Sequence, residues 1–121
     1  MNRIILLVED HDSLRYLMGA FLSRQFEVVG AKNGLDAMIW LGKGVIPDVI
    51  VTDVNMPGLS GAELLVNLRC SGIYSNIPVV VVSGSSNEEE EVHVRQLGAC
   101  DYIRKPFSPT TLQDRLRQIV D

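Results

Sequence analysis

The sequence is poor in the features that mark secreted, membrane and disulfide-rich proteins. Its 121 residues include two cysteines, Cys70 and Cys100, which lie far apart and form no CxxC motif. Two unmatched cysteines suit a reducing cytosol, so we expect a cytoplasmic protein. No apolar run approaches the roughly 20 residues needed to span a bilayer. The short apolar run after Arg3 has no cleavage site behind it, so neither a signal peptide nor membrane insertion is expected.

An excess of positive charge is also missing. The chain has 11 lysines and arginines against 15 aspartates and glutamates, which gives a net charge of −4. This balance argues against direct binding of nucleic acid, because phosphate contacts need clustered basic side chains. No low-complexity stretch or linker interrupts the chain, so residues 1–121 are expected to form one domain. Apolar residues make up 46% of the sequence, which is enough to build a core.

What the sequence does contain is an alternation of apolar runs with helix-period segments, the pattern of a parallel sheet. Continuously apolar runs at Ile4–Val8, Val49–Thr52 and Val79–Val82 are typical of strands that helices cover on both faces. Two weaker runs, Phe26–Gly30 and Cys100–Ile103, fit edge strands. With a helix after each strand, the sequence predicts an α/β fold: one five-stranded parallel sheet with helices on both faces.

The helical segments carry buried stripes and start signals. In the first helix, residues at helical spacing form the stripe Leu14, Leu17, Met18, Phe21 and Leu22. A looser stripe in the second helix consists of Leu35, Met38, Ile39 and Leu41. Capping boxes are indicated at residues 60–63 and 86–89, and Ser108-Pro109 begins the last helix. The acidic run 88–91 is expected to be a solvated first turn, favoured by the helix dipole.

Acidic side chains stand where two of the predicted strands end. Glu9 and Asp10 follow the first strand, and Asp53 follows the third. Carboxyl ends of parallel strands share one edge, where such sheets bind ligands, so three acids would crowd one cleft. Like charges repel, so the cluster needs a cation, and hard oxygen ligands suit Mg²⁺. With Lys105 as a second positive charge and Ser83 as a hydroxyl donor, this arrangement favours phosphoryl transfer to a nucleophilic aspartate.

Taken in this order, these residues resemble the receiver domain of two-component response regulators, of the chemotaxis-regulator type, over essentially the whole chain. The matching residues are Glu9-Asp10, Asp53-Val54-Asn55-Met56-Pro57, Gly61, Ser83 and Lys105-Pro106. The resemblance implies a flavodoxin-like sheet with strand order 2-1-3-4-5. It also implies a phosphorelay signalling switch whose only chemistry is its own phosphoryl transfer and autodephosphorylation, and which is otherwise not an enzyme.

The resemblance assigns the acceptor and the metal ligands. Asp53 would accept a phosphoryl group from a sensor histidine kinase or a phosphotransfer protein. Asp10, Asp53 and the backbone carbonyl of Asn55 would bind Mg²⁺ directly, and Glu9 would bind it mostly through water.

The resemblance also implies a switch. Lys105 would contact the phosphoryl group, and a cis peptide before Pro106 would help to aim it. Ser83 would turn inward on phosphorylation, and Tyr102 would rotate inward with it. This motion would couple the site to a face built by the fourth helix, the fifth strand and the fifth helix. Receivers bind a downstream protein or effector domain on that face, or form homodimers through it.

Three other functions fit parts of the sequence. A receiver that docks partners without phosphorylation would keep the fold, but the intact acids, Ser83 and Lys105 argue against it. A haloacid-dehalogenase-like phosphatase also places an aspartate after a strand, yet it needs a second one two residues on, where this chain has Asn55. Such an enzyme would also need room for a cap domain. A flavin-binding protein of the same topology would need a phosphate-cradling loop, and none is evident.

Overall fold

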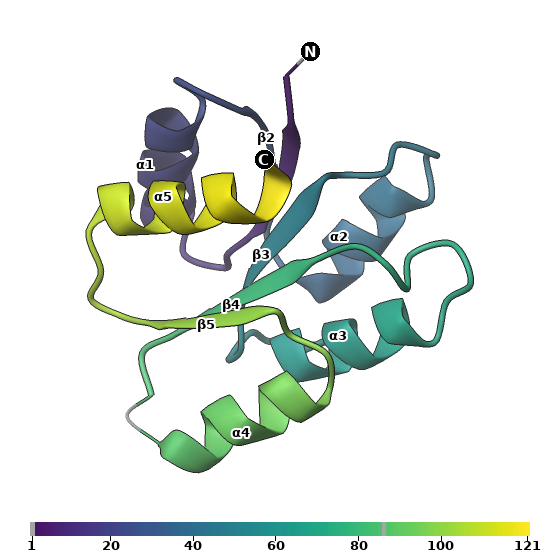
Figure 1. The fold of residues 1–121 in the computed structure, drawn as a ribbon. Helices are drawn as coiled ribbons and strands as arrows, with labels where there is room; N and C mark the ends of the chain where they lie inside the picture. The colour runs from purple at the N-terminus through teal and green to yellow at the C-terminus, as the bar shows by residue number, and fades with distance from the viewer. Residues whose placement is uncertain (1, 86) are drawn as a thin grey trace.

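The computed structural model describes residues 2–85 and 87–121, and within them five parallel strands alternate with five helices (Figure 1). The strands are β1 (Ile4–Val8), β2 (Glu27–Ala31), β3 (Val49–Asp53), β4 (Val79–Ser83) and β5 (Asp101–Arg104). The helices are α1 (Asp12–Leu22), α2 (Gly34–Leu41), α3 (Gly61–Arg69), α4 (Glu88–Gln96) and α5 (Pro109–Val120). The strands lie side by side in the order β2-β1-β3-β4-β5. The predicted α/β fold and the strand order implied by the resemblance are therefore confirmed.

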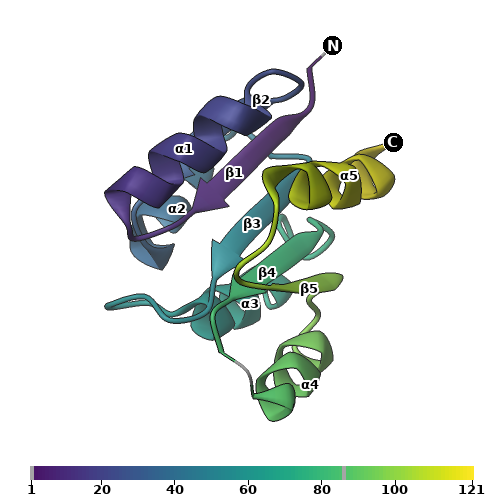
Figure 2. The ribbon, with the colours of Figure 1, turned by 90° about the vertical axis from the view of Figure 1, so that its left-hand side faces the viewer.

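The helices cover both faces of the sheet and bury two separate core layers (Figures 1 and 2). Helices α1 and α5 pack on one face, and α2, α3 and α4 pack on the other. Along β1, Ile5 and Leu7 enter the α1–α5 layer, whereas Leu6 and Val8 enter the opposite one. Because both faces of the central strands are covered, successive residues on both sides of these strands are apolar, up to the polar residues at the carboxyl ends of β3 and β4.

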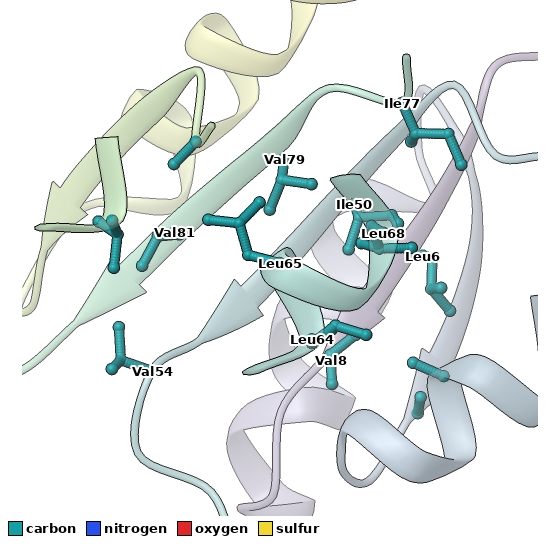
Figure 3. Packing of buried hydrophobic residues seen from close by; sticks show 14 of the residues in the cluster. Leu6, Val8, Ile50, Val54, Leu64, Leu65, Leu68, Ile77, Val79 and Val81 are labelled. Carbon is teal, nitrogen blue, oxygen red and sulfur yellow. The ribbon is translucent and has the colours of Figure 1, made fainter. Parts of the chain in front are cut away.

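Helix α3 shows how the sequence fixes an element beside the site. The side chain of Ser60 accepts a hydrogen bond from the Glu63 amide, and the Glu63 carboxylate accepts one from the Ser60 amide, which is the predicted capping box. Three fully buried leucines, Leu64, Leu65 and Leu68, pack against β1, β3 and β4 (Figure 3). Each contributes about 2 kcal/mol through burial, so α3 is held firmly against this face of the sheet.

The ends of several elements differ from the prediction by one residue. Both edge strands begin and end one residue later than expected, because their short and partly polar runs carry a weaker pattern. Strands β3 and β4 each extend one residue further than predicted, to include Asp53 and Ser83. Helix α4 is capped by Asn87, whose side chain accepts from the Glu89 amide. The predicted cap at Ser86 lies outside the described residues.

The predicted buried stripes of the first two helices are partly wrong. Leu17 is 64% exposed, because α1 packs through the narrower line of Met18 and Leu22. Leu35 and Ile39 are also exposed. The eight-residue helix α2 instead turns inward its residues Gly34, Ala37 and Leu41. Among the helices that the structure describes, none is both long enough and apolar enough to cross a bilayer.

Candidate functional site

The carboxyl ends of β1, β3, β4 and β5 bring the predicted site residues to one edge of the sheet. Asp53 pairs in register with Val82, and Ser83 pairs with Arg104 on the next strand. Glu9 follows β1, the other neighbour of β3. Four neighbouring strand ends therefore bring Glu9, Asp53, Ser83 and Lys105 to the same edge of the sheet.

One ammonium group, on Lys105, contacts two buried carboxylates. The Lys105 Nζ atom lies 2.8 Å from Asp53 Oδ2 and 3.0 Å from Glu9 Oε1. Glu9 is 1% exposed and Asp53 6% exposed, so both charges are almost removed from water. Burial acts to lower the pKa of Lys105, but hydrogen bonds to Asp53 and Glu9 and their charges outweigh it, and the pKa is raised. Lys105 is therefore firmly protonated at neutral pH.

The backbone around Asp53 is held on both sides. The amide of Val54 donates to Asp53 Oδ1 at 2.7 Å, and the Thr52 hydroxyl donates to the Asp53 carbonyl at 3.0 Å. The Gly61 amide donates to the Val54 carbonyl at 2.9 Å. A Cβ atom on Gly61 would collide with the Asp53 carbonyl and lie 2.9 Å from the Val54 Cα atom. This close approach explains why a glycine starts α3 beside the end of β3.

Glu9 also belongs to a second group, which it forms with Asp10 and His11. One ligand atom from each of Glu9, Asp10 and His11 lies within 4.8 Å of the others. The Asp10 Oδ1 atom is buried and has no hydrogen-bond partner among the described residues, and a buried oxygen left in this way costs free energy. His11 Nδ1 lies 3.4 Å from this oxygen and 3.2 Å from Glu9 Oε2. An unsatisfied carboxylate oxygen in a mostly carboxylate group fits a hard divalent cation such as Mg²⁺.

Ser83 and Tyr102 are linked through a residue that sequence reasoning missed. The fully buried Ser83 donates its hydroxyl to Glu90 Oε2 at 2.7 Å. Tyr102 is 6% exposed, and its hydroxyl donates to the same oxygen at 2.5 Å. The prediction of a solvated acidic turn is wrong for Glu90 and Glu91, which are half-buried, although Glu88 and Glu89 are exposed.

Nothing in the acidic run distinguishes Glu90 from its neighbours. What distinguishes it is its contact with Ser83 and Tyr102, which lie on two different strands, so spacing along α4 carries no signal for it.

The remaining predicted residues lie in the loops of the same edge. Asn55 is an exposed residue two positions beyond the end of β3. The peptide bond between Lys105 and Pro106 is cis. The Lys105 amide donates to the Ser83 carbonyl at 2.8 Å, which ties the lysine to the end of β4. The structure thus brings Glu9, Asp53 and Lys105 into direct contact, whereas the Ser83 hydroxyl points to Glu90.

Comparisons with known proteins agree with this geometry. Residues 5–117 match the family model described as the response regulator receiver domain. The chain is 34% identical over 122 residues to the chemotaxis protein CheY-3 of Vibrio cholerae, covering 99% of this chain and 93% of that protein. It is also 34% identical over 113 residues to hybrid signal transduction histidine kinase D of Dictyostelium discoideum. That match covers 93% of this chain but 7% of the kinase.

Solved structures show the same likeness. The structure of Vibrio cholerae chemotaxis protein CheY4 superposes with a TM-score of 0.91 at 29% identity, covering 98% of this chain and 99% of that chain.

Proposed function

The chain belongs to the response regulator receiver family, and we propose that it is a phosphorylation-operated switch whose acceptor is Asp53. The observation that carries this proposal is the contact of one ammonium, on Lys105, with both Asp53 and Glu9. A nucleophilic carboxylate meets an incoming phosphoryl group productively only where fixed positive charge offsets the negative charge on both. Lys105 supplies that charge, and burial strengthens its effect.

The proposed reaction moves a phosphoryl group from a histidine nitrogen of the donor to a carboxylate oxygen of Asp53. The donor would be a phosphohistidine of a sensor histidine kinase or of a phosphotransfer protein. A carboxylate oxygen of Asp53 attacks phosphorus, so a P–O bond forms while the P–N bond to the imidazole breaks and its electron pair stays on the nitrogen. Lys105 lies 2.8 Å from Asp53 Oδ2, where its N–H groups stabilise the charge that spreads over the transferred oxygens.

The acids around Asp53 suit a bound Mg²⁺ ion. Asp10, Asp53 and the backbone carbonyl of Asn55 would hold it directly, and Glu9 would hold it mostly through water. The unsatisfied Oδ1 atom of Asp10 supports this assignment. When bound, the ion supplies positive charge that offsets the carboxylates and the phosphoryl group.

The output surface in this proposal is the face formed by α4, β5 and α5. An ion-pair bridge supports the idea that these elements act together: Asp101 of β5 contacts Arg115 Nη1 of α5 at 2.7 Å and Arg95 Nη2 of α4 at 3.5 Å. A downstream protein or effector domain, or a second copy of the chain, would bind there. In this role residues 1–121 act as one signalling domain rather than as an enzyme with an external substrate.

Uptake of phosphoryl groups tests the proposal. The purified chain is incubated with a small acyl phosphate and Mg²⁺, and intact-mass spectrometry follows the addition of one phosphoryl group. We expect modification of the wild type and none of Asp53→Asn, with Asp114→Asn, an exposed acid on α5, as the matched control. An unmodified wild type would overturn the proposal. If a partner then bound wild type and Asp53→Ala equally, the chain would be a docking module that works without phosphate.

A further inference from the structure

We propose that Glu90 is a latch that holds the Ser83 hydroxyl away from Asp53 and couples it to Tyr102. The phosphate-dependent part of this inference rests on the proposed function. Its basis is a three-residue network from three elements: Ser83 ends β4, Glu90 lies in the first turn of α4, and Tyr102 lies in β5. A single carboxylate oxygen, Glu90 Oε2, accepts hydrogen bonds from both hydroxyls.

The hydroxyl of Ser83 has only one proton to give. That proton is directed to Glu90 at 2.7 Å, while the Ser83 oxygen accepts from the Ser85 amide at 3.1 Å. Ser83 is fully buried, so its hydroxyl relies on these two protein partners rather than on bulk water. Ser83 can donate to a phosphoryl oxygen on Asp53 only after it leaves Glu90. The carboxylate of Glu90 and the phosphoryl group therefore compete for one proton.

Tyr102 couples this competition to residues outside the site. Its hydroxyl shares the same oxygen of Glu90, and a hydrogen bond to a carboxylate is roughly twice as strong as one between neutral groups. When Ser83 leaves, Tyr102 is the side-chain donor that remains on that oxygen among residues 2–85 and 87–121. The hydrogen bonds that join β4, α4 and β5 then change, and α4 and β5 belong to the proposed output face.

Its hydrogen bonds to other elements set Glu90 apart from the other acids of its helix. Glu91 is half-buried too, but its carboxylate pairs with Arg95 of the same helix. Glu88 and Glu89 are exposed. Glu89 contributes its backbone amide to this turn, which donates a hydrogen bond to the Asn87 side chain. Glu89 and Glu90 stand in the same turn and have the same charge, so they affect the helix dipole alike. A comparison of the Glu90 and Glu89 replacements therefore separates the effect of the latch from a general effect of charge at the start of α4.

The first arm of the test needs no phosphate. Burial and then the hydrogen bond to Glu90 raise the pKa of Tyr102. The titration of the three tyrosines is followed by NMR of ¹³Cζ-labelled tyrosine, and Tyr102→Phe identifies the signal. We expect a lower pKa for Tyr102 in Glu90→Ala, a smaller decrease in Glu90→Gln, and no change in Glu89→Ala. If Glu90→Ala and Glu89→Ala titrate alike, the latch does not exist.

The second arm measures the steady-state ratio of phosphorylated to unphosphorylated chain with a small acyl phosphate and Mg²⁺. Glu90→Ala should raise this ratio about three- to tenfold, because the competing charged acceptor is gone, and Glu89→Ala should leave it unchanged. In a Ser83→Ala background, Glu90→Ala should have no further effect. An equal effect of Glu90→Ala in both backgrounds would overturn the latch. If the wild type takes up no phosphoryl group, the proposed function fails, and the tyrosine titration alone decides the latch.

Discussion

At the scale of single residues, the site depends on one positive charge that offsets two buried carboxylates. Glu9 and Asp53 are both buried, and Lys105 contacts both of them. Two carboxylates in such a place repel each other unless a cation stands between them. The lysine therefore has a structural role in the resting protein besides the chemical role that we propose for it.

Replacing Lys105 by methionine should lower the free energy of unfolding by about 2 kcal/mol at neutral pH, because two buried acceptors lose a charged donor. The effect should depend on pH. The pKa of Lys105 is raised above its usual 10.5 in the folded chain. The stabilisation is thus complete below that value and is lost as pH rises through the higher folded value. Urea unfolding of both proteins at neutral and strongly alkaline pH measures this, and a difference that persists unchanged at alkaline pH would contradict it.

Gly61 is a second sensitive position. Gly61→Ala should destabilise the chain by about 1–3 kcal/mol, the range for overpacking, because its Cβ would strike the backbone at Asp53. The variant should also slow phosphoryl uptake, since the acceptor's backbone is displaced. Gly72→Ala is the matched control, because a Cβ there meets no atom within 4 Å. Thermal unfolding compares the two, and equal stability of the two variants would refute the explanation.

At the scale of elements, α3 is tied to two loops by one side chain. The guanidinium of Arg69 donates to the carbonyls of Ser75, Ile77 and Gly98, at distances of 2.9–3.3 Å. Gly98 follows α4 with a φ of +109°, a conformation that favours glycine. Arg69 therefore joins the end of α3 to the chain entering β4 and to the turn between α4 and β5.

Arg69→Met should lower the free energy of unfolding by about 2–3 kcal/mol, because three carbonyls lose a charged donor. Arg117→Met is the control: it lies on α5, and its nearest acid, Asp121, is 3.9 Å away and exposed, a pair worth little. Denaturant unfolding distinguishes them. Equal midpoints for the two variants would show that the Arg69 contacts carry no net stability.

The sequence predicts central elements better than edge elements, for physical reasons. Strands β1, β3 and β4 are covered on both faces, so their runs are apolar, up to the last one or two residues of β3 and β4, and are easy to recognise. Helix stripes predict burial less well, as the exposed Leu17 shows, because a helix on a small sheet buries a narrow line of side chains. Glu90 was missed because its two partners come from other strands, and spacing along one helix says nothing about them.

At the scale of the whole molecule, the strand order creates the site. β1 and β3 are neighbours in the sheet although α1, β2 and α2 separate them along the chain, and this brings Glu9 close to Asp53. The same edge receives Ser83 from β4 and Lys105 from the end of β5. The residues of the site were identifiable from their places after apolar runs, but their distances depend on packing that no local pattern contains.

The proposed metal site predicts a global effect. A ligand that binds the folded chain alone stabilises it, by about 2.7 kcal/mol at roughly 100 times its Kd. Mg²⁺ should therefore raise the urea midpoint of the wild type beyond what NaCl of equal ionic strength does. The increase should be smaller in Asp10→Asn, which lacks the carboxylate with the unsatisfied buried oxygen. A response of Asp10→Asn equal to that of the wild type would rule out Asp10 as a ligand.

The central claim is that the phosphoryl group resides on Asp53, and locating it on the chain tests this most directly. An aspartyl phosphate is reduced by borohydride to homoserine, which remains at the modified position through proteolysis and peptide mass spectrometry. The account predicts homoserine at residue 53, formed only after incubation with phosphodonor and Mg²⁺. Homoserine at residue 10 instead, or a phosphoryl group mapped to His11 or another side chain, would contradict it.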